Sequence, residues 1–265
     1  MLCRKKTILT ALILTMTMFA FSGCAAGEDD SLNRVLESGE LTVSGSGGYP
    51  PFNFYEGNEV VGFDVDTGKA IAERLGVELN YETAEWSGLP EGLRAGYYDG
   101  ILGSMAITEE RLEIVNFTIP YYYSAAQLVV RKDSGITDPS EMEGKEIAVV
   151  TATTFVDDVE ELGAIPVLYE DDNQTLSELV NGRVDGVITD QNVAIDGIAN
   201  MRGGDELTMA GDILRLEKMA IAVNKSDVKL LNKLNEILEE MHEDGTLTEI
   251  SVKWHDGRDI TKVIE

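Results

Sequence analysis

Arg111 is the residue whose type fits its predicted position least well. Residues 103–111 read GSMAITEER, so an apolar run stops at Thr108, and two acids and the arginine follow in the first turn of a predicted helix. That end of a helix carries a partial positive charge, which disfavours a cation. Arginine also offers a planar fork of N–H donors that matches a carboxylate. Arg111 is therefore a candidate anion-binding residue, and an ion pair with Glu109 or Glu110 is the alternative.

Other polar and aromatic groups could complete a recognition site. Thr153 and Thr154 stand before a helical pattern, where hydroxyls and free backbone N–H groups bind anions. Asp190 ends a predicted strand as an acid that could accept from an ammonium group. Tyr49 and Trp86 lie beside turns and could enclose a side chain. Helix capping by Thr154 and Asp190, and burial of the two aromatics, are the alternatives. Together these groups would hold a carboxylate, an ammonium group and a side chain, as a free amino acid requires.

The sequence offers little for catalysis. Its two histidines, His242 and His255, lie near the C-terminus in surroundings typical of a surface, and no nucleophile–histidine–acid arrangement is apparent. It has no HExxH motif and no regular acidic calcium loop. The stretch GSGGYPPF lacks both GxGxxG and a Walker lysine. We therefore expect no catalytic residue, no metal site and no cofactor.

Charge and cysteine content narrow the class further. The formal net charge is −27, so nucleic acid is not expected as a partner. A basic start at residues 4–6 and a short apolar core predict a signal peptide. Residues 21–24, FSGC, resemble the lipobox of bacterial lipoproteins, which predicts cleavage and lipidation at Cys24, although Phe21 replaces the usual aliphatic residue. A conventional signal peptide is the alternative. Cys3 leaves with the signal, so the mature chain cannot form an internal disulfide.

Strand-like and helix-like segments alternate after residue 40, which predicts an α/β fold. One unit occurs twice, because LRAGYYDGILGS at 93–104 and LVNGRVDGVITD at 179–190 align without a gap. Both read as a helix end, a glycine cap, a tight turn and a buried strand, and chance recurrence of a common unit is the alternative. We expect two similar lobes with Ser104 and Asp190 at the carboxyl ends of their strands, where ligands bind in open α/β sheets.

Two apolar runs, at 126–132 and 219–225, bracket the second copy and predict paired strands that cross between the lobes. The predicted organisation is a lipoprotein signal peptide at 1–23, a tether at 24–36, a first lobe at 37–130 plus 222–265, and a second lobe at 131–221. The amphipathic helix over residues 226–245 is expected to return to the first lobe.

The sequence resembles the polar amino-acid family of ABC-transporter solute-binding lipoproteins over nearly all of residues 40–255. The stretches that carry the resemblance are GYPPFNF, GFDVDTGKAIAERLG, GLRAGYYDGILGSMAITEERLEIVNFTIPYYYSAAQLVVRK, GKEIAVVTATT, GRVDGVITD and MHEDGTLTEISVKW. The resemblance implies the two-lobe periplasmic-binding-protein type II fold, or Venus flytrap. It also implies roles for seven residues. Arg111 and Thr154 bind the ligand carboxylate, Asp190 binds the ammonium group, backbone groups of Ser104 and Ala106 complete these contacts, and Tyr49 and Trp86 flank the side chain.

Two residues depart from the family pattern. Ala106 replaces a usual hydroxyl residue, so one ammonium contact is expected to be lost, and Ala152 replaces the glycine of a GTT loop. Basic-amino-acid binders of the family often carry an acid at the position of Ser46, which is neutral here, as are Val150 and Thr189. This pattern favours a polar-neutral or apolar ligand side chain over a basic one.

The resulting hypothesis is an extracytoplasmic, lipid-anchored and monomeric solute-binding component of an ABC importer. It would bind a free amino acid by lobe closure and then dock on a membrane permease that is powered by an ATPase. Two alternatives stay open. One is an enzyme similar to cyclohexadienyl dehydratase, which has the same fold, and the other is a ligand-sensing co-receptor.

Overall fold

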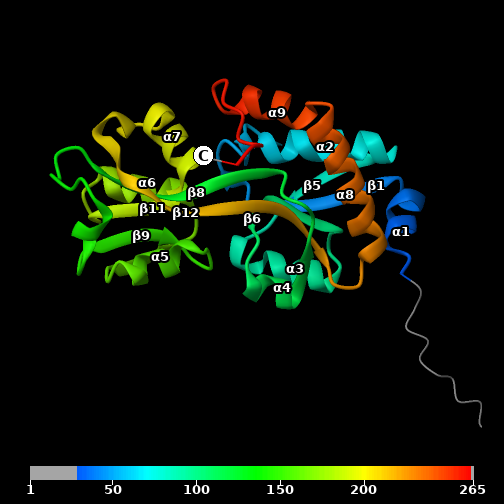
Figure 1. Ribbon diagram of the computed structural model, residues 1–265, viewed down its shortest axis with the longest axis horizontal. Helices are drawn as coiled ribbons and strands as arrows, with labels where there is room; N and C mark the ends of the chain where they lie inside the picture. Colours follow the sequence, from blue (N-terminus) through cyan, green and yellow to red (C-terminus); the bar gives the residue numbers. More distant parts are fainter. Residues whose placement is uncertain (1–28, 264–265) are drawn as a thin grey trace, which may run out of the picture.

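The computed structural model describes residues 29–263, so the expected signal peptide and Cys24 lie outside the described residues. Two lobes lie side by side and are joined by two long strands, β8 (Tyr122–Arg131) and β12 (Leu207–Asn224) (Figure 1). These strands pair antiparallel, with a register shift between Ala210 and Arg215. The two-lobe α/β fold and the two strands that cross between the lobes are confirmed. The predicted pairing of the runs 126–132 and 219–225 with each other is wrong in register, because residues 126–131 pair with 207–215, and residues 219–224 pair with 100–106 and 115–117.

The first lobe is built on the strand order β5-β1-β6-β12, in which β1 pairs parallel with both β5 and β6. Every residue of β6 is buried, as expected for a central strand covered on both faces. Helices α2, α8 and α9 lie on one side of this sheet and α3 and α4 on the other (Figure 1). Apart from the crossing strands, the elements of this lobe have the following bounds: α1 (Ser31–Ser38), β1 (Glu40–Gly45), β2 (Gly48–Tyr49), β3 (Asn53–Glu56), β4 (Glu59–Val61), α2 (Phe63–Leu75), β5 (Glu78–Thr83), the 3-10 turn η1 (Trp86–Gly88), α3 (Leu89–Ala95), β6 (Gly100–Ala106), α4 (Glu109–Ile114), β7 (Val115–Phe117), α8 (Val228–Glu243) and α9 (Thr246–Trp254).

The second lobe repeats this plan on a smaller scale, with the strand order β10-β9-β11-β8. Strand β9 pairs parallel with β10 and β11, and β11 pairs antiparallel with β8. Helix α5 lies on one side of the sheet, and α6 and α7 lie on the other (Figure 1). The elements are η2 (Pro139–Met142), β9 (Glu146–Val150), α5 (Phe155–Glu161), β10 (Ile165–Tyr169), α6 (Asp172–Val180), β11 (Gly186–Asp190), α7 (Gln191–Asn200) and η3 (Gly204–Glu206).

The repeated unit of the sequence forms the same hydrogen bonds in both lobes. The backbone N–H of Asp99 donates to the Thr42 carbonyl over 2.8 Å, and the Asp99 carboxylate accepts from the Thr42 N–H over 3.0 Å. Asp185 makes the equivalent pair of bonds with Glu146, also at 2.8 and 3.0 Å. Each aspartate thus ties the strand after the turn to the first strand of its own lobe, β1 or β9. This shared bonding supports the interpretation of the two segments as copies of one structural unit.

Part of the predicted tether is a helix. Residues 31–38 form α1, and the side chain of Val35 is completely buried in the core of the first lobe. The carboxylate of Asp29 accepts from the backbone N–H of Lys229 over 2.6 Å, and the hydroxyl of Ser31 accepts from the N–H of Leu230 over 3.2 Å. The prediction of a tether up to residue 36 is therefore wrong for this helix, because α1 packs against the start of α8.

One of the two histidines is also placed differently from the prediction. His255 is 1% exposed and packs against the rings of Phe52 and Phe63, with centroids 5.1 and 5.4 Å away. Burial, with a smaller effect from the positive charge of Arg258, lowers the pKa of His255 to about 3. The expected solvated histidine is thus a neutral core residue. The Nε2 atom of His242 lies 2.9 Å from the Pro120 carbonyl.

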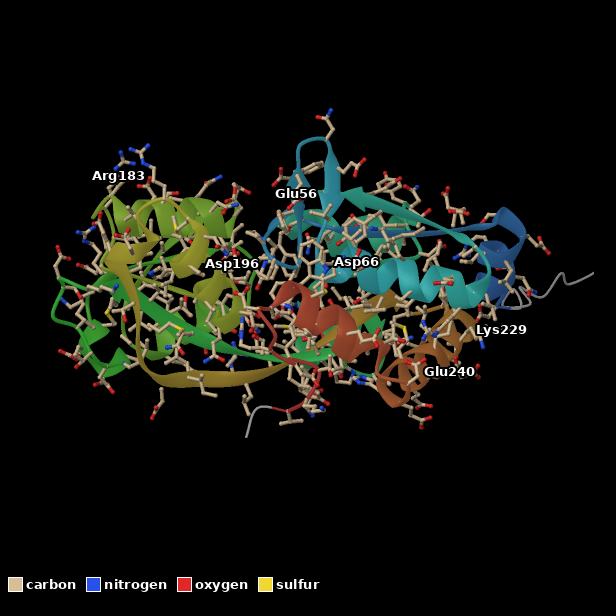
Figure 2. The ribbon with its side chains drawn as sticks, turned by 90° about the horizontal axis from the view of Figure 1, so that it is seen from above. Glu56, Asp66, Arg183, Asp196, Lys229 and Glu240 are labelled. Carbon is tan, nitrogen blue, oxygen red and sulfur yellow. The ribbon has the colours of Figure 1, made fainter. Side chains whose placement is uncertain are left out.

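Charged side chains cover the outside of both lobes. Glu56, Arg183 and Glu240 are exposed and project from the surface (Figure 2). Arg183 pairs with Glu178 on the same surface, at 2.6 Å. Exposed pairs of this kind contribute little to stability, so most of the acidic charge of the sequence serves solvation.

Candidate ligand-binding site

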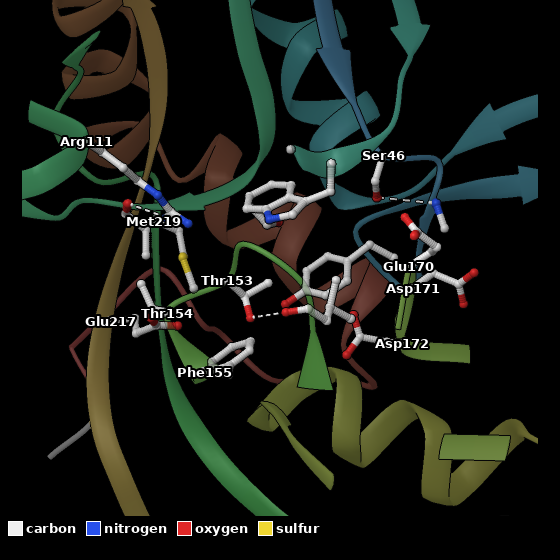
Figure 3. Close-up of a pocket in the computed structure, with 17 residues that line it drawn as sticks. Ser46, Arg111, Thr153, Thr154, Phe155, Glu170, Asp171, Asp172, Glu217 and Met219 are labelled. Atoms are coloured by element: carbon white, nitrogen blue, oxygen red, sulfur yellow. Dashed lines mark hydrogen bonds between the residues drawn. The ribbon is translucent and has the colours of Figure 1, made fainter. Parts of the chain in front are cut away.

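A cavity lies between the two lobes and has a volume of about 520 Å³ when its opening to solvent is included. Six of the seven predicted binding residues lie on its wall, namely Tyr49, Trp86, Ser104, Ala106, Arg111 and Thr154. Arg111, Thr154 and Glu217 lie toward one end, and Ser46, Glu170 and Asp171 lie toward the other (Figure 3). Asp190, the seventh predicted residue, is not part of the wall.

Arg111 lies on α4, whose first residues are held by a side-chain cap. The Thr108 hydroxyl accepts from the Arg111 backbone N–H over 3.1 Å, which fixes the start of the helix. The guanidinium donates from Nη1 to the Ala106 carbonyl over 2.9 Å and from Nη2 to the Ala152 carbonyl over 3.4 Å. Among the described residues no carboxylate forms an ion pair with it. Burial lowers the pKa of Arg111, while the charges of Glu217 and Glu110 act in the opposite direction.

Trp86 joins Arg111 in a contact between the lobes. Its Nε1 donates to the same Ala152 carbonyl over 3.1 Å, and the Arg111 guanidinium carbon lies 5.5 Å from the Trp86 ring centroid. Ala152 has a φ of 57°, the left-handed conformation that favours glycine. The alanine therefore adopts the backbone conformation that a glycine would take in this loop. The lobes are thus in direct contact across the cavity.

Aromatic rings form the apolar part of the wall. Tyr49 stacks on Phe52, with centroids 5.3 Å apart, and Phe52 stacks on the buried ring of Tyr122 at 4.9 Å. Phe155, the first residue of α5, faces the cavity from the second lobe (Figure 3). Burial raises the pKa of Tyr49 well above its usual value, and the nearby Asp190, Asp172 and Glu217 carboxylates raise it further. Tyr49 is therefore a neutral phenol beside the cavity.

Ser104 is held by a buried polar network. Its backbone has a φ of 60°, its N–H donates to the Tyr121 hydroxyl over 3.1 Å, and its own hydroxyl donates to the Asp64 carboxylate over 3.0 Å. Asp64 also accepts from Tyr121 over 2.6 Å and from Asn53 over 2.7 Å. The hydroxyl and the N–H of Ser104 are therefore committed to the protein.

We expect the Asp64 network to make stability depend on pH. Burial outweighs the three hydrogen bonds and raises the pKa of Asp64 from 3.8 to about 7. The folded state then holds the proton more tightly than the unfolded state, so the contribution of this group to unfolding free energy falls as pH rises from 4 to 7. In wild type relative to Asp64→Asn, chemical denaturation should show a fall of about 2–4 kcal/mol across this range and no further change above it.

Asp138→Asn provides the control for this pH series. The Asp138 carboxylate is exposed, and hydrogen bonds from Ser140 lower its pKa. Its contribution to stability is therefore present above the unfolded pKa and is lost as pH falls, which is the opposite sign. A wild type and an Asp64→Asn variant whose stabilities run parallel between pH 4 and 7 would contradict the assignment.

Thr154 takes part in an ionic network of the second lobe. Its hydroxyl donates to Glu217 Oε1 over 2.6 Å and does not cap α5. Arg215 donates to the same Glu217 oxygen over 2.8 Å and forms two hydrogen bonds with the Asp158 carboxylate, at 2.7 and 3.1 Å. Helix α5 is thereby tied to strand β12. Two members of this network, Glu217 and Thr154, line the cavity (Figure 3).

Asp190 is completely buried and caps α7, which is the alternative weighed from the sequence. Its carboxylate accepts from the Asn192 N–H over 2.7 Å, while Oδ2 has no hydrogen-bond partner among the described residues. Burial raises the pKa of Asp190 to about 7, and the Glu217 charge adds to this effect. At neutral pH the carboxyl is therefore protonated in a substantial part of the molecules.

Acidic residues that the sequence analysis did not single out line the cavity. Glu170, Asp171 and Asp172 follow β10, and Glu217 lies within β12. Two signals could have identified them. The first three come directly after a strand, where α/β sheets bind ligands. Glu217 shares a strand face with the buried Met219, two residues on, so period-two alternation places it inward.

Two of the three positions that were compared with basic-amino-acid binders line the cavity, namely Ser46 and Val150. Thr189 is completely buried, and its hydroxyl donates to Asp172. Ala106 is 5% exposed, and its carbonyl accepts from Arg111. At this position the wall therefore offers a methyl group and a committed carbonyl.

A search against protein families gives the chain its classification. The model of the bacterial extracellular solute-binding proteins, family 3, matches residues 41–257. The chain belongs to this family. Membership of a family of extracellular binding proteins places this family 3 protein outside the cytoplasm. In residues 29–263 no helix combines the length and apolar character needed to cross a membrane, and no cluster of acids, histidines or cysteines is suited to a metal ion.

Individual relatives of this family 3 protein are similar over nearly their whole length. The probable amino-acid-binding protein YxeM of Bacillus subtilis (strain 168) is 32% identical over 259 residues, covering 95% of this chain and 96% of that relative. The P235GK mutant of ArgBP from T. maritima is 34% identical with a TM-score of 0.80, covering 85% of this chain and 99% of that chain. The ancestral amino acid-binding protein AncCDT-1, a precursor of cyclohexadienyl dehydratase, is 30% identical with a TM-score of 0.79 and the same coverage.

Proposed function

We propose that this family 3 protein binds a free amino acid in the cavity between its lobes and delivers it to the permease of an ABC importer. The observation that carries the proposal is the half-buried Arg111 guanidinium, which faces the cavity without a carboxylate partner among the described residues. A ligand carboxylate would supply a direct ion-pair partner for this guanidinium. The similarity to named amino-acid-binding proteins supports the same ligand class.

The proposed mechanism is capture by closure. Arg111, Trp86 and Tyr49 belong to the first lobe and would bind the ligand first. The second lobe would then bring Thr154 and Phe155 onto it by bending of β8 and β12. The resemblance assigns the ammonium group to Asp190, which lies behind the cavity wall in this chain. Aromatic rings on both lobes would enclose the side chain.

The acids at the far end of the cavity change the expected ligand side chain. The neutral residues at the positions of Ser46 and Val150 favoured a polar-neutral or apolar side chain. Glu170, Asp171 and Asp172 line the same cavity as Ser46 and Val150. These acids would favour a ligand side chain that is cationic or rich in hydrogen-bond donors. ArgBP from T. maritima, a similar structure, has an arginine-bound form. We therefore place basic amino acids first among the candidates.

Calorimetric titration of the mature chain tests the proposal. The panel is the twenty common L-amino acids with L-ornithine and L-cystine, and thermal shift serves as a first screen because a ligand that binds the folded state raises the melting temperature. Saturable binding of at least one amino acid, with a stoichiometry of one, is the expected result. A chain that binds none of them, when its thermal unfolding is cooperative, would overturn the proposal.

The alternatives predict different observations. An enzyme similar to cyclohexadienyl dehydratase would convert prephenate or arogenate, and product absorbance would reveal it; the similar AncCDT-1 is named as a precursor of that enzyme and as an amino-acid-binding protein. We propose that this chain has no such activity, since the described histidines do not line the cavity. A co-receptor role would be recognised by a signalling partner that binds only the liganded form.

We further propose that the protein is a monomer anchored by a lipid on Cys24 at the outer face of the cell membrane. The proposal of a lipid anchor rests on residues 1–24 of the sequence alone. Mass spectrometry of the membrane fraction would detect the lipid on Cys24. A Cys24→Ser variant released into the medium or periplasm would support the anchor, whereas unchanged membrane association would contradict it.

A further inference from the structure

Glu217 presents an unused acceptor at the carboxylate-binding end of the cavity. Its side chain is almost completely buried, at 1% exposed, and the residue lies on the cavity wall. Oε1 accepts from Thr154 and Arg215, whereas Oε2 has no hydrogen-bond partner among the described residues. A buried carboxylate oxygen without a donor is costly, so a group that binds in the cavity gains by supplying one.

The charges around Glu217 leave room for a cation beside the anion that Arg111 is proposed to bind. Arg215 pairs with both Asp158 and Glu217, so one positive charge meets two negative ones. Arg111 adds the second positive charge, and the Glu217 charge acts on it through space. The formal charges of these four side chains sum to zero. A zwitterionic ligand would leave this net charge unchanged, because its carboxylate would pair with Arg111 and its ammonium group would pair with Glu217.

Asp190 is less well placed for the ammonium group. Its Oδ2 lacks a hydrogen-bond partner among the described residues, as Glu217 Oε2 does, but Asp190 is absent from the cavity wall and its other oxygen caps α7. Glu217, in contrast, lines the cavity and is paired with an arginine. The two acids lie close enough for the charge of Glu217 to raise the pKa of Asp190. A positive group bound to Glu217 would therefore also affect the pKa of Asp190.

We propose that Glu217 Oε2 accepts the hydrogen bond of the ligand's α-ammonium group, and that Glu217 therefore selects ligands that carry this group. The inference rests on the proposed amino-acid function and refines its site. It assigns the ammonium contact to a residue of the strand between the lobes, β12, rather than to Asp190. The ligand would then bridge Arg111 on the first lobe and the Glu217–Thr154 pair.

The test compares Glu217→Gln with Asp190→Asn in calorimetric titrations. The probes are the tightest-binding L-amino acid of the panel and the same acid without its α-amino group, which for L-arginine is 5-guanidinopentanoate. Glutamine can still accept from Thr154 and Arg215 but places a neutral amide at the cavity. We expect Glu217→Gln to weaken the amino acid about 10- to 100-fold and to leave the des-amino acid within about threefold, since a hydrogen bond to a charged group is at stake. Asp190→Asn should preserve the wild-type preference for the amino acid over the des-amino acid.

Controls separate this inference from the proposed function. Thermal unfolding of each variant shows whether it folds, and Glu217→Asp, which keeps the charge but withdraws it by one methylene, replaces Glu217→Gln if that variant is unstable. A wild type that binds no amino acid overturns both proposals. Binding that Glu217→Gln leaves unchanged or tightens, or a preference lost in Asp190→Asn instead, overturns the role of Glu217 while the amino-acid function stands.

Discussion

Arg111→Ala is expected to weaken amino-acid binding by about 100-fold or more. The variant removes two N–H donors and the positive charge that would meet the ligand carboxylate, and the carboxylate would then be buried without a counter-charge. Losses of this kind cost about 3–5 kcal/mol. Calorimetric titration with the tightest-binding amino acid of the panel measures the change. The Ala152 carbonyl would keep its bond to Trp86, so the loop of the second lobe should retain its position.

Arg94→Ala is the matched control for Arg111→Ala. Arg94 belongs to the same lobe, its side chain is 55% exposed, and it pairs with Glu91 on the surface. Its removal should leave the dissociation constant within about twofold, as expected for an exposed pair. Arg111→Lys should fall between the two, because lysine keeps the charge but not the planar fork. Binding that survives Arg111→Ala unweakened would show that the carboxylate lies elsewhere.

Gly62→Ala is expected to lower the unfolding free energy by more than about 3 kcal/mol. Gly62 precedes α2 with a φ of 132°, and an added Cβ would lie 2.1 Å from the Phe52 carbonyl oxygen. That oxygen cannot withdraw freely, since it accepts from the Asp64 N–H over 2.9 Å at the start of the helix. Backbone strain and overlap each cost about 1–3 kcal/mol. Thermal unfolding should show a melting temperature lower by about 6 °C or more.

Gly57→Ala measures the cost of a positive φ at a glycine where no atom lies close to the added Cβ. Gly57 has a φ of 64°, and a Cβ added there meets no atom within 4 Å. Its substitution should cost about 1 kcal/mol, the penalty of the left-handed conformation. Equal losses in the two variants would contradict the close approach at Gly62.

The regular elements of the fold were predictable because their signals are local. In the segment that forms helix α2, apolar residues recur at helical spacing, Asp64 and Asp66 stand at the start and Gly76 stands at the end, and the helix ends at Leu75, just before this glycine. Helix α1 was missed because its burial depends on α8, about 200 residues later. His255 was misjudged for the same reason, since Phe52 and Phe63 reach it only through the fold.

The candidate site was predictable in position but not in its internal contacts. Strand ends and the repeated unit indicated which segments face the cavity, and six of the seven residues lie there. Hydrogen bonds within the site could not be read from spacing. The Ser104 hydroxyl is committed to Asp64, and the Thr154 hydroxyl is committed to Glu217, because strands distant in sequence meet at the cavity.

The carbonyl of Ala152 has a consequence for the rate of binding as well as for its strength. It accepts hydrogen bonds from Trp86 and Arg111 of the opposite lobe. Because these two bonds join the lobes across the cavity, we expect ligand entry to follow their opening, as the second of two steps. In stopped-flow measurements the observed rate should level off at high ligand concentration, at the opening rate of the lobes. The opening of the hydrogen bonds to the Ala152 carbonyl would then limit the rate of ligand binding.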